Sequence, residues 1–213
     1  MESNYHFEEE FYQIDFTENK TLYGDYENCK FLQCNFNAID LSHLKFIDCE
    51  FIECNLSLVK LNDTSFQKVL FKDSKMIGFN LETCNTFALN ISFDTCILND
   101  SSLYQLPLKK TKFSNTTLQN VDFSYADLSN SYFANCDFSN AIFDQTNLRQ
   151  ANLKTSYNFN INPNENQLKG AIFSKDNLEG FDKSEDEFYS LVSDAPQKKN
   201  PNPSGVSNSG TGS

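Results

Sequence analysis

Large apolar residues recur at every fifth position along most of the chain. One run extends from Phe31 to Leu81 and a second from Phe93 to Leu153. All 24 of these central positions hold Phe, Leu or Met, although Phe and Leu together make up only about a fifth of the residues. Polar residues (Asn, Asp, Ser, Lys and Gln) lie between the central positions. The spacing is therefore a true internal repeat, and it determines how the rest of the sequence is interpreted.

A five-residue period fits neither an α-helix nor a flat strand. In a helix the central residues would spiral over every face, and in a strand alternate ones would point to solvent. The pattern is satisfied if the chain turns a corner every five residues, so that four sides close a coil of 20 residues. A compact residue (Cys, Ala, Ser, Thr or Val) stands two positions before most central residues and faces inward with them.

Stacked coils at the usual strand spacing of about 4.8 Å place central residues of successive coils above one another. From Phe11 to Leu153 the chain has room for about seven such coils, a rod roughly 34 Å long. The expected core ladder consists of Phe31, Phe51, Phe71, Phe93, Phe113 and Phe133.

The two runs are out of phase, because Leu81 and Phe93 are 12 residues apart. Two extra residues therefore lie between them, which predicts a bulge or a small bend. The irregularity is either tolerated packing or a feature that contacts a partner. Pro107 does not change the five-residue spacing. Because proline has no N–H, we expect it at a position where the backbone hydrogen bonding between coils needs no donor.

Composition and charge narrow the classes of protein. The chain of 213 residues holds 29 acidic and 17 basic side chains, a net charge of −12, and residues 1–60 alone hold 12 acidic and 4 basic ones. This balance argues against direct nucleic-acid binding and against docking on an anionic membrane. No apolar stretch approaches the length of a membrane span, and the first residues lack the pattern of a signal peptide, so we expect a cytoplasmic protein.

Candidate chemistry is sparse. Six of the seven cysteines occupy the compact inward site, and Cys84 does so too if the first phase continues. We expect free thiols in the core, although Cys29 and Cys49, or Cys34 and Cys54, stack closely enough for a disulfide. The carboxylates fall on outward positions and neither histidine lies near a nucleophile motif. We therefore expect no enzyme activity, no metal and no cofactor.

The repeat resembles that of the pentapeptide-repeat family, as in Ala126–Asn130 followed by Ser131–Asn135. The resemblance implies an all-β fold, a right-handed quadrilateral β-helix of about seven coils. We assign residues 1–10 to an N-terminal lead-in, 11–180 to the β-helix and 181–193 to a short C-terminal helical cap that begins near the capping box Ser184–Glu187. The Pro- and Ser-rich segment 194–213 is expected to be disordered.

The resemblance extends to the branch of the family with Qnr-type and mycobacterial members, which bind DNA gyrase or topoisomerase IV. It implies a non-enzymatic mimic of DNA that protects a type II topoisomerase from quinolones or toxins, acting as a homodimer joined at its C-terminal end. An interaction scaffold with another partner is the alternative. The candidate topoisomerase contacts are Asp122, Asp127, Asp137 and Asp144, and the candidate cap or dimer residues are Phe173, Phe181, Phe188, Leu191 and Val192.

Overall fold

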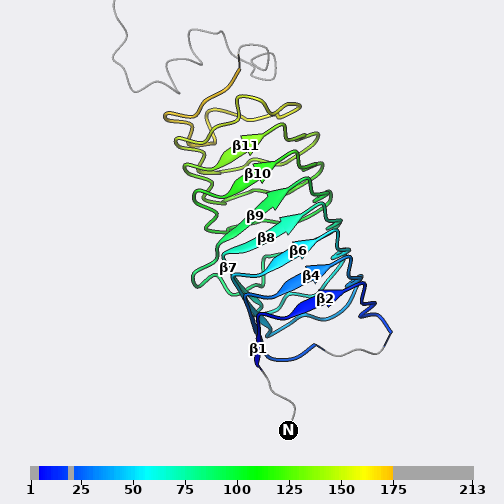
Figure 1. Ribbon diagram of the computed structural model, residues 1–213. Coiled ribbons are helices and arrows are strands. Elements are labelled where there is room, and N and C mark those ends of the chain that lie inside the picture. The colour runs from blue at the N-terminus through cyan, green and yellow to red at the C-terminus, as the bar shows by residue number, and fades with distance from the viewer. Residues whose placement is uncertain (1–4, 19–21, 175–213) are drawn as a thin grey trace, which may run out of the picture.

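The chain forms a rod of stacked coils made of very short strands (Figure 1). The structure is a computed structural model, and it describes residues 5–18 and 22–174. No helix occurs among these residues. The strands are β1 Tyr5–Phe7, β2 Glu10–Tyr12, β3 Asp25–Glu27, β4 Lys30–Leu32, β5 Lys45–Ile47, β6 Glu50–Ile52, β7 Ser65–Gln67, β8 Val69–Lys72, β9 Ile91–Asp94, β10 Lys112–Ser114 and β11 Tyr132–Ala134.

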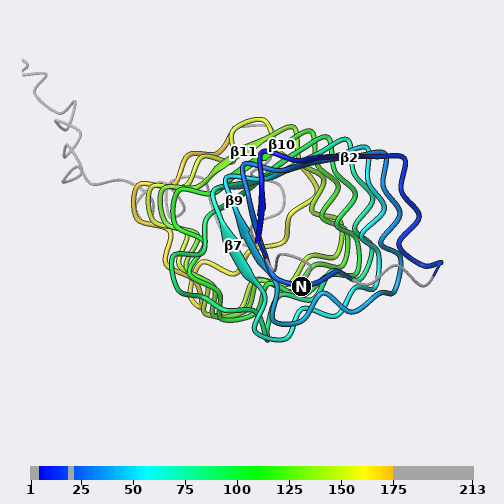
Figure 2. The ribbon, with the colours of Figure 1, turned by 60° about the horizontal axis from the view of Figure 1, so that its bottom comes forward.

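Parallel pairing between successive coils confirms the predicted fold class. A seven-stranded sheet in the order β11-β10-β9-β8-β6-β4-β2 marks six full turns, and bridges from Tyr132 to Asn152 and from Asn152 to Ile172 continue it. Partners are 20 residues apart, as in Phe31 with Phe51. Seen from the N-terminal end, the chain winds clockwise as it recedes, so the β-helix is right-handed (Figure 2). β1, within the predicted lead-in, already pairs with β3.

The rod has four faces, named here in chain order. Face I carries β1, β3, β5 and β7, and face II carries the seven-stranded sheet. Face III is the side with central residues such as Phe36 and Leu56, and face IV the side with central residues such as Leu41 and Leu61. The central residues of all four faces meet inside the coil.

Stacked phenylalanines form the interior of face II. The predicted ladder residues Phe31, Phe51, Phe71, Phe93, Phe113 and Phe133 are all 0–1% exposed. Their ring centroids are 4.7 to 5.4 Å apart from one coil to the next, with nearly parallel planes. The strand spacing of about 4.8 Å explains this contact, because parallel in-register strands bring identical side chains within stacking distance.

Corners are made by a left-handed backbone residue two positions after most central residues. Asn120, Asn130 and Asn140 have φ between 56° and 60°, and Asp, Gln and even Leu58 adopt the same conformation at other corners. Asn and Asp tolerate this region better than most residues, which explains the polar residues between central positions. At many corners an Asp or Asn before the central residue supports the turn, as where Asp122 Oδ1 accepts from the backbone N–H of Ser124 at 2.8 Å.

The compact site is a hydrogen-bond site as well as a small one. Cys54 Sγ donates to the carbonyl of Phe31 at 3.2 Å, and Thr64 and Ser131 use their hydroxyls in the same way. Each donor reaches the carbonyl of a central residue on the preceding coil. The interpretation of the cysteines as small apolar fillers is therefore incomplete, since Ser and Thr are equally suited to the position.

The phase shift produces a bulge on face I. Phe71 pairs with Phe93, so this coil is 22 residues long, and Thr86 and Phe87 lie outside the core. Phe79 occupies the compact site before the central residue Leu81, and its buried ring packs against that of Phe66 with centroids 6.3 Å apart.

Pro107 lies on the coil that follows the bulge, at the ladder position where Asn85 and Asp127 donate their backbone N–H to the preceding coil. Proline has no such hydrogen to donate, and no bridge links Asn85 to Pro107 among the described pairs.

Candidate functional site

Two kinds of feature are absent from the residues that the structure describes. These residues include no group of three or more His, Cys, Asp or Glu side chains placed to bind a metal ion. Across the same ranges, no helix has the length and apolar character needed to cross a bilayer.

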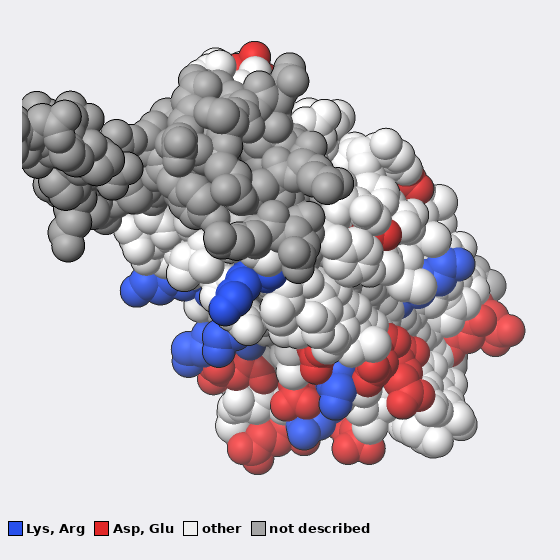
Figure 3. All heavy atoms as spheres, turned by 90° about the horizontal axis from the view of Figure 1, so that it is seen from above, with Lys and Arg blue, Asp and Glu red and all other residues white. Residues whose placement is uncertain are grey.

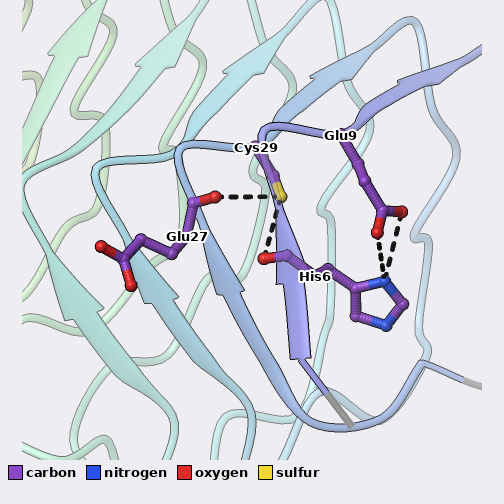
Figure 4. Close-up of polar contacts among 4 residues, drawn as sticks. All are labelled: His6, Glu9, Glu27 and Cys29. Carbon is purple, nitrogen blue, oxygen red and sulfur yellow. Dashed lines mark hydrogen bonds and ion pairs between the residues drawn. The ribbon is translucent and has the colours of Figure 1, made fainter. Parts of the chain in front are cut away.

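The N-terminal coil brings a thiol, an imidazole and carboxylates near one another (Figure 4). His6 Nδ1 lies 3.1 Å from Glu9 Oε1, and its ring stacks on Tyr26 at 4.5 Å between centroids. Cys29 Sγ, however, donates to the backbone carbonyls of His6 and Glu27 rather than to the imidazole. Burial raises the pKa of this thiol, whereas an activated nucleophile needs a lowered one.

All seven cysteines are free thiols in the interior. Burial raises the pKa of Cys49 and Cys96 to about 12, and that of Cys84 and Cys136 to about 11. Thiols held in the neutral form behave as weak hydrogen-bond donors in the core rather than as reactive groups.

The four aspartates expected to contact a topoisomerase lie on three different faces. Asp122 and Asp144 are both on face IV, where Tyr125 donates its backbone N–H to the carbonyl of Asp144. Asp127 lies on face I, 3.3 Å from the ammonium group of Lys109. Asp137 lies on face III. The structure thus brings Asp122 and Asp144 onto one surface but not the other two.

Asp137 corrects the expectation that every carboxylate is solvated. The residue is only 9% exposed, and it accepts hydrogen bonds from Gln119 (2.7 Å), Ser139 and Asn158 (2.9 Å). Burial alone would raise its pKa, but these donors outweigh burial and lower it. Asp122, Asp127 and Asp137 each also accept the backbone N–H two residues ahead, so a role in the turn accounts for these three side chains.

Of the candidate cap residues, the structure describes Phe173. It is partly buried against the core, with its ring 5.4 Å from that of Phe159. The predicted helix 181–193 with Phe181, Phe188, Leu191 and Val192, and the segment 194–213, lie outside the described residues.

Charge is distributed unevenly around the rod. Seen from the C-terminal end, Lys and Arg gather on one side, whereas Asp and Glu dominate the adjoining side (Figure 3). On the C-terminal half of face I, the exposed side chains of Lys109, Lys110, Arg149 and Lys169 share neighbouring columns. Charge counted along the chain does not reveal this basic surface, although Lys109 and Arg149 are 40 residues apart, which is two coils.

Two family models match the chain on either side of the bulge. The model described as pentapeptide repeats (8 copies) matches residues 29–73, and the one described as a pentapeptide repeat region matches residues 87–153. The chain belongs to the pentapeptide-repeat family. A comparison with curated protein sequences finds no match.

Solved structures of pentapeptide-repeat proteins share the fold. Two structures of QnrB1, a plasmid-mediated fluoroquinolone resistance protein, each of a trypsin-treated variant, are 16% and 18% identical. They cover 80% of this chain and 90% and 92% of their own, with TM-scores of 0.54 and 0.53. HetL, from the cyanobacterium Nostoc sp. strain PCC 7120, is 16% identical over 83% of this chain and 84% of its own, with a TM-score of 0.43. At these identities the likeness to the two QnrB1 structures shows the fold alone.

Proposed function

We propose that this pentapeptide-repeat protein is a non-enzymatic mimic of duplex DNA that binds a type II topoisomerase and protects it from quinolones or topoisomerase-poisoning toxins. The observation that carries the proposal is the acidic surface of the N-terminal coils on a straight, regular rod. A topoisomerase holds DNA through Lys and Arg side chains that neutralise phosphates, and ordered carboxylates are suited to the same cations.

Face II presents the clearest array of this kind. Glu10, Glu50, Glu53, Asp73 and Asp94 project from it over five successive coils, a distance of about 19 Å along the rod. Two lysines interrupt the array, and one of them, Lys30, lies 3.6 Å from Glu50. The likeness in fold to QnrB1, a fluoroquinolone resistance protein, adds support for the class of target.

On face IV, Asp122 and Asp144 remain proposed contacts. Asp127 and Asp137 are weaker candidates within the same proposal, because their carboxylates are already engaged by Lys109 and by Gln119 and Asn158. Dimerisation through the C-terminal end is part of the proposal.

A DNA gyrase supercoiling assay containing ciprofloxacin tests the proposal. The wild-type protein should restore supercoiling, and the variant E50Q/E53Q/D73N should lose most of this protection. The variant D63N/E82Q/D100N removes the same charge from faces III and IV and should protect like the wild type. Absence of both protection and gyrase binding at micromolar concentrations would overturn the proposal.

A second candidate function is that of an interaction scaffold for a protein other than a topoisomerase. The basic C-terminal half of face I favours it, because a surface that imitates DNA would not carry Lys109, Lys110 and Arg149 together. An affinity pull-down that enriches such a partner with the wild type, but not with Arg149→Glu, would favour the scaffold over the DNA mimic.

A further inference from the structure

Face I has opposite charges at its two ends and an exposed aromatic ring at its middle. Nine coils cross this face. The residues that pair with the neighbouring coils, one position before the central residues, are Tyr5, Asp25, Lys45, Ser65, Asn85, Pro107, Asp127, Asn147 and Gln167. The bulge occupies the fifth of these nine coils, so it lies at the centre of the face.

The N-terminal end of face I is acidic. Its first three coils carry four outward carboxylates, namely Glu8, Asp25, Glu27 and Asp48. Two ammonium groups partly balance them, since Lys45 lies 3.6 Å from Asp25 and Lys68, on the fourth coil, lies 3.2 Å from Asp48. Two negative charges remain in excess.

The C-terminal end of face I is basic. Lys109, Lys110, Arg149 and Lys169 outnumber the single carboxylate, Asp127. Backbone bonds fix their stacking, because Asn130 donates to the carbonyl of Arg149 at 2.8 Å. Within the described ranges, the exposed guanidinium of Arg149 forms no ion pair.

Phe87 stands between the two charged ends. Its side chain is 80% exposed, more than any other large apolar residue that the structure describes. The turn holds it in place, because its backbone N–H donates to Asn85 Oδ1 at 2.9 Å. Burial of this ring against a partner would be favourable by a few kcal/mol.

We propose that face I binds face I of a second copy of the chain. The two rods are antiparallel, and the two-fold axis passes between them at the level of Phe87. Under this symmetry a coil that lies a given number of coils before the bulge faces, on the partner, the coil that lies the same number after it. It sets Phe87 against its own copy, Glu27 against Arg149, and Lys45 against Asp127. Lys68 faces Lys110, a like-charged pair that the ion pair between Lys68 and Asp48 moderates.

The dimensions fit a modest interface. Eight coil spacings give a face about 38 Å long, and a side of five residues is at most about 16 Å wide. Two such faces bury on the order of 1,200 Å² together, the lower limit for a specific interface. With so many charges at its ends, the association should weaken as salt rises.

Sedimentation velocity of the full chain tests the charge pairing. We expect the particle mass to double between about 0.5 M and about 0.05 M salt, whether the high-salt species is a single chain or a dimer joined at its C-terminal end. Arg149→Glu should shift the equilibrium to the smaller species, and the double swap Arg149→Glu/Glu27→Arg should restore the larger one. Lys154→Glu, a matched change on face II of the same coil, should leave it unaltered. A mass that does not change with salt, or an association that Arg149→Glu does not weaken, would overturn the proposal.

Crosslinking locates the axis and separates this dimer from one joined at the C-terminal end. A Phe87→Cys variant should form a disulfide-linked dimer on mild oxidation, because a residue on a two-fold axis meets its own copy. Tyr157→Cys, on face III, should not. A dimer in which neither cysteine crosslinks would contradict the proposed face. Gyrase protection is read in a separate assay, so failure of either proposal leaves the other distinguishable.

Discussion

Truncation of Phe133 tests the five-residue register at a single coil. Phe133 and Tyr132 are neighbours on β11, yet the first is 0% and the second 46% exposed. The register requires that Phe133 face the core and Tyr132 face solvent. The pair of variants Phe133→Ala and Tyr132→Ala therefore compares two aromatic truncations that differ chiefly in direction.

The expected magnitudes follow from the contacts. The ring of Phe133 stacks on Phe113 at 4.8 Å and packs edge-on against Phe138 at 5.3 Å. Loss of a fully buried phenyl group removes its transfer free energy and leaves a cavity, a cost of about 3–5 kcal/mol. Truncation of the exposed Tyr132 should cost about 0.5 kcal/mol or less.

Urea unfolding followed by far-UV circular dichroism measures both costs, and Phe133→Leu serves as the conservative control. Leu fills much of the cavity and should cost clearly less than Ala. Equal effects of Phe133→Ala and Tyr132→Ala, or a cost below about 1 kcal/mol for Phe133→Ala, would refute the reasoning.

Three further predictions follow from the corners, the thiols and the buried carboxylate. Leu58→Asn should stabilise the protein by about 0.5–1 kcal/mol in urea unfolding, because Leu58 holds φ at 57°; destabilisation would contradict this account of the corners. None of the seven thiols should react rapidly with Ellman's reagent before unfolding, and fast labelling of even one would contradict the burial described. Asp137→Asn should cost about 1–2 kcal/mol at pH 7, where the wild-type carboxylate is charged and bonded. Because the folded-state pKa of Asp137 is lowered from 3.8, its contribution is full above that value and lost as pH falls through the folded-state pKa. Unfolding free energies at pH 7 and pH 3 should therefore show the variant and wild type converging in acid, and a constant difference would exclude this assignment.

The fold was predictable because one physical requirement repeats along the chain. Each central residue must be large and apolar, so Phe31 and Phe113 carry the same signal although the bulge separates them. The position of the phase shift was visible in the sequence. The way in which the core packs around it was not. Phe79 occupies a site that elsewhere mostly holds Cys, Ala, Ser, Thr or Val, and its contacts with Phe66 and Phe71 show how it fills the gap.

The outer surface was harder to predict, since the same residue types serve turns and partners. Asp122 and Asp137 both stand before a central residue in an Asp-Phe-Ser sequence, yet Asp137 is a buried acceptor and Asp122 is only half-buried. Columns formed by residues 20 or 40 apart, such as Lys109 with Arg149, appear only once the chain is wound into coils. Charge counted by segment conceals these columns, because each segment samples all four faces.

Competition between the protein and duplex DNA for DNA gyrase tests the central claim most directly. Fluorescence anisotropy of a labelled duplex bound to gyrase should fall as the wild-type protein is added, whereas E50Q/E53Q/D73N should displace it poorly and D63N/E82Q/D100N as well as the wild type. If gyrase keeps the duplex at micromolar concentrations of the wild-type protein, the rod does not occupy the DNA site and the proposed mimicry is contradicted.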